Sequence, residues 1–278
     1  MKAFANTDEF ALLYPETAAR LTHQLADHPL FTLEALAALA ARMRTSDIEY
    51  NRGDLPLGIE FDSVPANGLS VADTIDGIHD NGSWMVLKLV QQDFAYHALL
   101  TDALAAMGPA VQSRTGAMLK QQAFIFISSP HSVTPLHFDP EHNILLQLRG
   151  TKTMTVFAAT DEEIAPPEAH EGLHMGTGHR NLPWKSAYAR RGQRFELVPG
   201  DGLYVPLMAP HSVLNGPDVS ISFSITWRSA HSFAEADARG MNALLRRAGL
   251  TPSTPGRYPA RNLTKSFAYR AIRQLSVR

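Results

Sequence analysis

The chain has 278 residues, of which 45% are hydrophobic and 19% charged, and it contains no cysteine. These values are typical of a globular protein with a sizeable core, and they exclude disulfide bonds, thiolate metal sites and cysteine nucleophiles. No apolar run reaches the roughly 18 residues of a transmembrane helix, and the N-terminus lacks the apolar centre of a signal peptide, so we expect a cytoplasmic protein with no membrane contact.

The charge is distributed unevenly along the chain. The net charge is −2, but residues 228–278 hold ten lysines or arginines against two acids, Glu235 and Asp237. That segment is therefore +8 and residues 1–227 are −10. Because the positive charges are scattered and form no block, the main expectation is a solvated or subunit-contacting helical face. An acidic partner is the second interpretation, and nucleic acid is not favoured.

The N-terminal part, 1–121, is expected to be a helical and mixed scaffold that packs on the rest. Helices are predicted at Pro15–Ala26, Thr32–Met43, Val71–His79 and Phe94–Met107. Thr32 is the expected N-cap of the second helix, and Gly108-Pro109 is expected to end the fourth. The apolar run Trp84–Val90 is expected to be extended, and Asn51–Gly68, with three glycines and two prolines, to be a loop.

From about Gln122 the hydrophobic spacing changes from helical to strand-like. Strands are predicted at Ala123–Ile127, His142–Leu148, Thr153–Phe157, Arg194–Val198, Leu203–Pro206 and Val219–Trp227. Glycine-containing turns at 149–152 and 199–202 are expected to close two hairpins. In the last strand apolar residues alternate with Ser222, Ser224 and Thr226. An outward face is the main expectation for these three residues, and a position lining the barrel is the alternative. Several short strands separated by such turns favour a β-barrel or sandwich.

Two further segments complete the expected organisation. The insert 158–191 is rich in proline, glycine, histidine and charge without a clear period, and we expect a long loop that shapes the entrance to a site. Helices are predicted at Phe233–Ala248 and Leu263–Leu275, joined by a proline-containing linker. The predicted domains are thus the scaffold 1–121, a β core at 122–228 with its insert, and basic C-terminal helices at 229–278.

Three side chains have the composition of a metal site. His137 and Asp139 are two residues apart, so on an extended strand both point to one face, and His211 follows 74 positions after His137. Two histidines and one carboxylate are the ligand set of non-haem Fe(II) oxygenases. Pro135 and Pro140 bracket the first pair and stiffen its backbone. Structural histidines of a barrel without activity are the alternative interpretation.

Several polar residues are candidates for the same site. Lys152 follows His137 by 15 residues, on a strand expected to return beside it, and a buried ammonium there requires a bound carboxylate or phosphate. Thr134 and Asn143 add neutral hydrogen-bonding groups, although such residues also satisfy turns. Tyr204 is expected either to donate a hydrogen bond into the site or to belong to the core. His131 and His142 are expected at the rim or on the surface.

The segment T-P-L-H-F-D-P-E-H-N-I-L-L-Q-L-R-G-T-K-T-M-T-V-F at 134–157 resembles the core of the JmjC-type cupins. It is most similar to the branch that contains the asparaginyl hydroxylase of hypoxia-inducible factor. The resemblance covers residues 122–227 and includes G-D-G-L-Y-V-P before the distal histidine. The chain departs from the family at Ala209-Pro210, where an aromatic pair is usual, and at Ile225, where asparagine is frequent.

The resemblance implies a mainly β fold with flanking α-helices, in which a double-stranded β-helix of the jelly-roll, cupin-like type is wrapped by N- and C-terminal helices. It implies that His137, Asp139 and His211 bind catalytic Fe(II). Lys152, assisted by Thr134, would bind the distal carboxylate of 2-oxoglutarate, with Asn143 lining the cosubstrate site. The implied reaction is hydroxylation of a C–H bond with O2, while 2-oxoglutarate is decarboxylated to succinate.

Other functions stay open at this stage. The first alternative is a cupin without oxygenase activity that acts as a ligand- or nucleic-acid-binding regulatory module, and another is a metal-dependent isomerase or hydrolase. The substrate is not specified by the sequence: a protein, a peptide or a small molecule would each fit. A homodimer through the C-terminal helices is expected, by the resemblance and because their apolar faces need burial.

Overall fold

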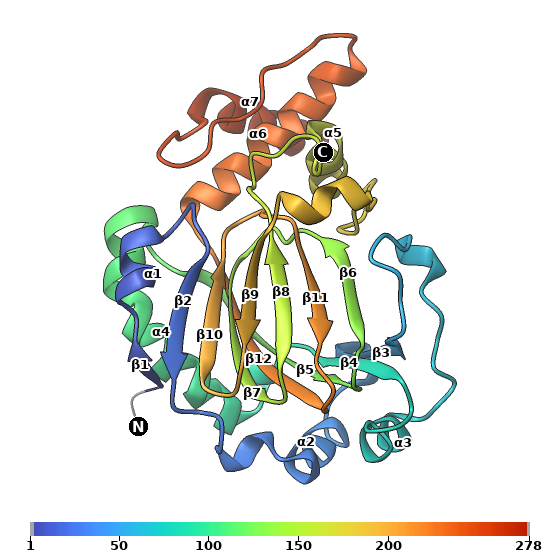
Figure 1. Ribbon diagram of the computed structural model, residues 1–278. Coiled ribbons are helices and arrows are strands. Elements are labelled where there is room, and N and C mark those ends of the chain that lie inside the picture. Colours follow the sequence, from blue (N-terminus) through green and yellow to red (C-terminus); the bar gives the residue numbers. More distant parts are fainter. Residues whose placement is uncertain (1–2, 277–278) are drawn as a thin grey trace.

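Two antiparallel sheets face each other in the computed structural model, and helices cover the outer face of the larger sheet and one end of the pair (Figure 1). The structure describes residues 3–276. Met1, Lys2, Val277 and Arg278, which belong to the expected scaffold and basic tail, lie outside the described residues. The predicted mainly β fold of the double-stranded β-helix type, flanked by helices, is confirmed.

The larger sheet has eight strands in the order β1-β2-β10-β7-β12-β5-β4-β3. Their bounds are Phe4–Asn6 (β1), Ala19–His23 (β2), Asp201–Val205 (β10), His142–Arg149 (β7), Ser220–Arg228 (β12), Leu119–Ser128 (β5), Ser83–Leu87 (β4) and Ile48–Arg52 (β3). The smaller sheet has the order β6-β11-β8-β9. Its strands are Val133–His137 (β6), His211–Asn215 (β11), Lys152–Val156 (β8) and Gln193–Leu197 (β9).

Seven α-helices surround the sheets in the described part of the chain. They are Asp8–Leu13 (α1), Leu33–Ala40 (α2), Val71–Asp76 (α3), Phe94–Thr115 (α4), Pro167–Met175 (α5), Ala230–Arg247 (α6) and Leu263–Ser276 (α7). Short 3-10 turns lie at Pro29–Phe31, Thr45–Asp47, Phe61–Ser63, Val90–Gln92 and Ser186–Arg190. The predicted N-cap is confirmed, because the Thr32 hydroxyl accepts a hydrogen bond from Ala35 N at 3.2 Å. Within residues 3–276, no helix combines the length and the apolarity that crossing a membrane requires.

Two predictions in the scaffold are wrong. Residues 15–26 contain strand β2 and no helix, because Ala19, Leu21 and His23 alternate into the core while the backbone pairs with β10. Pairing with a strand about 180 residues away thus overrides the local helical pattern. Gly108-Pro109 does not end α4, which continues to Thr115. The continuation buries Val111 completely, and this packing compensates for the hydrogen bond that proline cannot make.

The two predicted hairpins are also wrong. Strand β7 pairs with β10 and β12 in the larger sheet, whereas β8 pairs with β9 and β11 in the smaller one, so 149–152 is a corner between sheets. Gly150 makes this corner with φ +66°, and a Cβ there would lie 2.5 Å from Val219 O. Strands β9 and β10 likewise belong to different sheets. Corner and hairpin use the same turn residues, so spacing alone does not separate them.

The main core lies outside the barrel, between the larger sheet and the N-terminal helices. Ile221, Phe223 and Ile225 of β12 point to this side and are fully buried there together with residues of α1, α2 and α4. Ser222, Ser224 and Thr226 therefore face the space between the sheets, and the expected outward position of these residues is wrong. They are buried, and the Ser222 hydroxyl donates to Gln147 Oε1 at 2.7 Å.

The insert 158–191 is more ordered than the expected loop. It contains α5 and the turn 186–190, and residues 180–182 pair with the free edge of β6. Phe138 N donates to Arg180 O at 3.1 Å and Leu182 N donates to Leu136 O at 2.8 Å. The insert is thereby fixed against the strand that carries His137.

The basic C-terminal segment forms ion pairs, mostly with the acidic body of the protein. The pairs are Arg228–Glu141, Arg239–Glu235, Arg246–Glu168, Arg246–Glu171, Arg257–Glu16, Arg257–Glu235 and Arg270–Asp237. Four of these six acids lie before residue 228, so much of the positive charge is neutralised within the chain.

Candidate metal centre

His137 and His211 meet because their strands are neighbours. Strands β6 and β11 are antiparallel, and their register places the two histidines directly opposite each other, with ring centroids 4.1 Å apart. Each imidazole is oriented by its own backbone: Nδ1 of His137 contacts Pro135 O at 2.8 Å, and Nδ1 of His211 contacts Ala209 O at 2.9 Å. A carbonyl accepts only, so both Nδ1 atoms carry the proton and both Nε2 atoms are left as ligand atoms.

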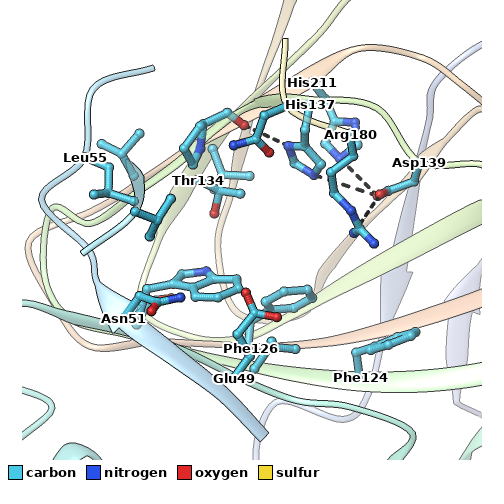
Figure 2. A pocket seen from close by; sticks show the side chains of 18 of the residues that line it. Glu49, Asn51, Leu55, Phe124, Phe126, Thr134, His137, Asp139, Arg180 and His211 are labelled. Carbon is cyan, nitrogen blue, oxygen red and sulfur yellow. Dashed lines mark hydrogen bonds and ion pairs between the residues drawn. The ribbon is translucent and has the colours of Figure 1, made fainter. Parts of the chain in front are cut away.

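Asp139 supplies the third side chain, two residues past the end of β6. Its Oδ2 lies 3.8 Å from His137 Nε2 and 3.7 Å from His211 Nε2, and its Oδ1 accepts a hydrogen bond from Arg180 Nη1 at 3.1 Å (Figure 2). The two carboxylate oxygens thus have different partners. One faces the histidines, and the other is held by the guanidinium of the insert.

The protonation states of this group suit a metal ion. Burial, followed by the neighbouring His211, lowers the pKa of His137 to about 4. Burial alone would raise the pKa of Asp139, but His137, Arg180 and His211 hold it below its ordinary value. At neutral pH His137 is therefore neutral and Asp139 ionised, as metal ligands must be. Within residues 3–276, these three residues form the sole group of three or more histidines and acids whose ligand atoms all lie within 4.8 Å of one another.

The three side chains open into a cavity of about 650 Å³ between the sheets, and Lys152 lines the same cavity. This lysine is buried, and desolvation lowers its pKa to about 7. No acid lies in ion-pair distance of it in the part of the chain that the structure describes. Lys152 comes from β8, next to β11 and opposite Asn215, and is not on a strand beside β6 as the sequence suggested. A bound anion would give this buried ammonium the counter-charge that it lacks.

The other predicted cosubstrate residues divide into two groups. Thr134 and Asn143 line the cavity, and Asn143 Oδ1 accepts a hydrogen bond from Ser224 Oγ at 2.8 Å, which orients its amide. Tyr204 does not line it. Its fully buried ring packs on the helix side of the larger sheet, and its hydroxyl donates to Pro15 O at 2.9 Å.

The expectation for His142 is wrong, whereas His131 is exposed as expected. His142 is buried, and its Nδ1 lies 2.8 Å from the Tyr204 hydroxyl. Its ring stacks on Trp227 at 5.4 Å between centroids. Burial lowers the pKa of His142 to about 3, so this histidine is a neutral part of the core. Strand alternation predicts this buried position. Neighbouring residues of a strand face opposite sides, and Asn143, which follows His142, faces the cavity.

A second histidine pattern, H-E-G-L-H at 170–174, has the spacing of a zinc metalloprotease motif and lies on α5. The structure gives it a different role. Glu171 is paired with Arg246 at 2.9 Å, and His170 stacks on Phe138 with ring centroids 4.9 Å apart. Burial and the nearby Arg239 lower the pKa of His170 to about 2. The motif therefore packs against Phe138, the residue between His137 and Asp139, and binds no metal in this interpretation.

Comparison with known proteins supports these observations at the level of fold and family. A family model described as "Cupin-like domain" matches residues 81–233, and a search of curated proteins finds none that matches. One similar solved structure is that of Escherichia coli ycfD, with a TM-score of 0.54 and 16% identity over 99% of this chain and 69% of that one. Another, the Escherichia coli ribosomal oxygenase YcfD, has a TM-score of 0.51 and 16% identity over 98% of this chain and 66% of that one.

The chain thus spans about two thirds of the length of the solved proteins that it resembles. The matched residues 81–233 comprise more than half of the sequence and contain both sheets' central strands, all three converging side chains and Lys152. The protein therefore belongs to the family defined by the cupin-like domain.

Proposed function

We propose that the protein is an Fe(II)- and 2-oxoglutarate-dependent oxygenase that hydroxylates a C–H bond. One observation carries the proposal: a group of two histidines and one carboxylate lines the same cavity as a buried lysine without a counter-charge. The first is the donor set of non-haem iron, and the second fits a dianionic cosubstrate. The membership of the cupin-like family agrees with both.

In this proposal His137, Asp139 and His211 hold the iron, and Lys152 with Thr134 holds the distal carboxylate of 2-oxoglutarate beside Asn143. The chemistry that Fe(II) supplies when bound is the coupled oxidation in which R–H, O2 and 2-oxoglutarate give R–OH, succinate and CO2. The chain's own residues orient the ligands through Pro135 O and Ala209 O, fix the carboxylate through Arg180, and surround the cosubstrate with a largely apolar wall.

Anaerobic titration with Fe(II) and 2-oxoglutarate tests the proposal. A visible metal-to-ligand charge-transfer band, followed by succinate formation after O2 is admitted, is the expected result. Absence of both would leave a cupin that binds ligands without oxidising them. Substrate turnover without O2 consumption would instead identify a metal-dependent hydrolase or isomerase.

Replacing Arg180 by methionine is expected to weaken metal affinity by about 10- to 100-fold, the usual effect of removing a residue that orients a ligand. Without the guanidinium, Oδ1 of Asp139 loses its hydrogen bond and the carboxylate can rotate. Fe(II) binding measured anaerobically by calorimetry checks this. Arg190→Met, on an exposed turn of the same insert, is the matched control and should bind Fe(II) like the wild type. Equal affinity of both variants would refute the role of Arg180.

For the substrate we propose a protein, because one similar solved structure is named a ribosomal oxygenase. A second proposal concerns a second copy of this chain as partner. Leu263, Phe267 and Leu275 of α7 are 66%, 77% and 73% exposed and are spaced to share one helix face. Such a stripe fits a homodimer contact.

If α7 forms that contact, Phe267→Asp is expected to shift the protein from dimer to monomer, because a carboxylate in an apolar interface loses its hydration. Sedimentation velocity at micromolar concentration measures this. Phe94→Asp, at an 88% exposed position on α4, is the control that should remain dimeric. A wild-type monomer would contradict the dimer proposal.

A further inference from the structure

The cavity has a second wall, opposite the metal-binding side chains. The larger sheet continues through β5, β4 and β3, and alternate residues of these strands face the cavity. Phe124 and Phe126 lie across the open space from the three metal-binding side chains (Figure 2). Glu49 and Asn51 line the same wall from β3, at the edge of the sheet. Reactants bound at the iron would therefore lie between the ligands and this wall.

The wall is aromatic and incompletely covered. Trp84 of β4 lies against Phe126 with ring centroids 6.0 Å apart and planes at 44°. The rings of Trp84, Phe124 and Phe126 are all half-buried, although β4 and β5 each have a neighbouring strand on both sides. Leu55 and Val64, from the loop after β3, line the cavity as well. Covering such rings with an apolar group is favourable, since each buried ring removes a large apolar area from water.

The charged side chains that line the cavity already have ion-pair partners or a role in the proposed binding of 2-oxoglutarate. Glu49 pairs with Lys88 at 2.6 Å, Asp139 pairs with Arg180, and Lys152 is the anchor proposed for 2-oxoglutarate. A charged guest on the aromatic wall would therefore lose hydration and would have to compete with these existing partners for a counter-charge. The remaining polar side chains at that wall, Asn51 and Ser128, are neutral, and Asn51 offers both a donor and an acceptor.

We propose that Trp84, Phe124 and Phe126 form the subsite for the group to be oxidised, and that it selects an uncharged aromatic or branched apolar side chain. The proposal rests on the function assigned above, because that function places the reacting atom between wall and metal. Asn51 gives a hydrogen bond to a neutral polar atom of such a guest. Phe124 and Phe126 are specificity-determining residues, since they contact the guest and not the metal.

Binding of small probes tests the subsite without requiring turnover. The probes are the N-acetyl amides of tryptophan, phenylalanine and leucine, compared with those of lysine, arginine and aspartate. Binding is followed by saturation-transfer NMR on the full chain, and proximity to the metal site by line broadening after loading with Mn(II). The uncharged apolar probes should bind at least about tenfold more tightly than the charged ones, which corresponds to about 1.4 kcal/mol.

Phe126→Ala should weaken the aromatic probes by about tenfold and leave Mn(II) affinity unchanged, because Phe126 does not contact the ligands. Phe126→Leu retains apolar bulk and should restore binding of the leucine probe, which separates loss of the wall from loss of fold. Phe94→Ala, the same truncation at an exposed position, is the matched control.

Preferential binding of the lysine or arginine probe would show that Glu49 selects a cation and would overturn the proposal. Failure of every probe to bind, or equal binding by wild type and Phe126→Ala, would overturn it too. Loss of Mn(II) binding and of succinate formation, with aromatic probe binding intact, would instead contradict the oxygenase function and not the subsite.

Discussion

Replacing Asp139 by alanine is expected to abolish Fe(II) binding and oxygen-dependent turnover while the fold is retained. The carboxylate is the anionic member of the ligand set, and its loss leaves two imidazoles that bind a divalent ion weakly. Charge stabilisation of several kcal/mol by a metal corresponds to a rate loss on the order of a thousandfold or more. Succinate formation and anaerobic Fe(II) titration measure the two effects.

The fold should survive because the two histidines are oriented by backbone carbonyls and not by Asp139. Circular dichroism and the unfolding midpoint check that point. Asp80→Ala removes an exposed carboxylate that also lies beside a histidine, His79, and should behave like the wild type. A folded Asp139→Ala protein with full oxygen-dependent activity would disprove the assignment of this residue.

Replacing Lys152 by methionine is expected to raise the KM for 2-oxoglutarate by about 100-fold. Removing one partner of a buried charge pair costs on the order of 2–5 kcal/mol, and the cosubstrate carboxylate would otherwise be left unpaired. Methionine fills the space beside Met154 and keeps the smaller sheet packed. Initial rates of succinate formation at varied 2-oxoglutarate check the effect, and Lys88→Met, which replaces the other lysine that lines the cavity, is the matched control.

The same lysine gives a pH dependence. In the ligand-free protein the pKa of Lys152 is lowered to about 7, and a bound carboxylate favours the charged form, so binding above that pH takes up a proton. The affinity for 2-oxoglutarate should therefore be constant below pH 7 and fall by up to about tenfold per unit above it. Lys152→Met should lose this dependence. A wild-type affinity that is unchanged between pH 7 and 9 would contradict the role of the lysine.

The sequence predicts those parts of the site in which the residues are close together along the chain. His137 and Asp139 are two residues apart on one segment, and the strand alternation of residues 219–227 is preserved in β12. His211 is brought opposite His137 by a strand pairing that spacing does not specify, and it was identified by residue type and resemblance.

The errors concern contacts between segments far apart in the chain. Which face of β12 meets the helices depends on where α1, α2 and α4 pack, and alternation gives two faces without saying which is inside. Tyr204 and His142 lie on the helix side for the same reason. Arg180 carries no signal in the sequence, because its position is set by pairing of residues 180–182 with the edge of β6. The sequence does not predict the aromatic wall, because Phe124 and Phe126 have the spacing of ordinary strand residues.

The order of strands in the larger sheet also bears on how the chain folds. Its central strand, β12, comes from residues 220–228, and β2 near the N-terminus pairs with β10 from residues 201–205. Residues of α1, α2 and α4 share one core with residues of β5, β7 and β12, which are synthesised later. Contacts between segments so distant in sequence are slow to form. We therefore expect part of the apolar surface of the N-terminal helices to stay uncovered during synthesis until β12 is available for packing.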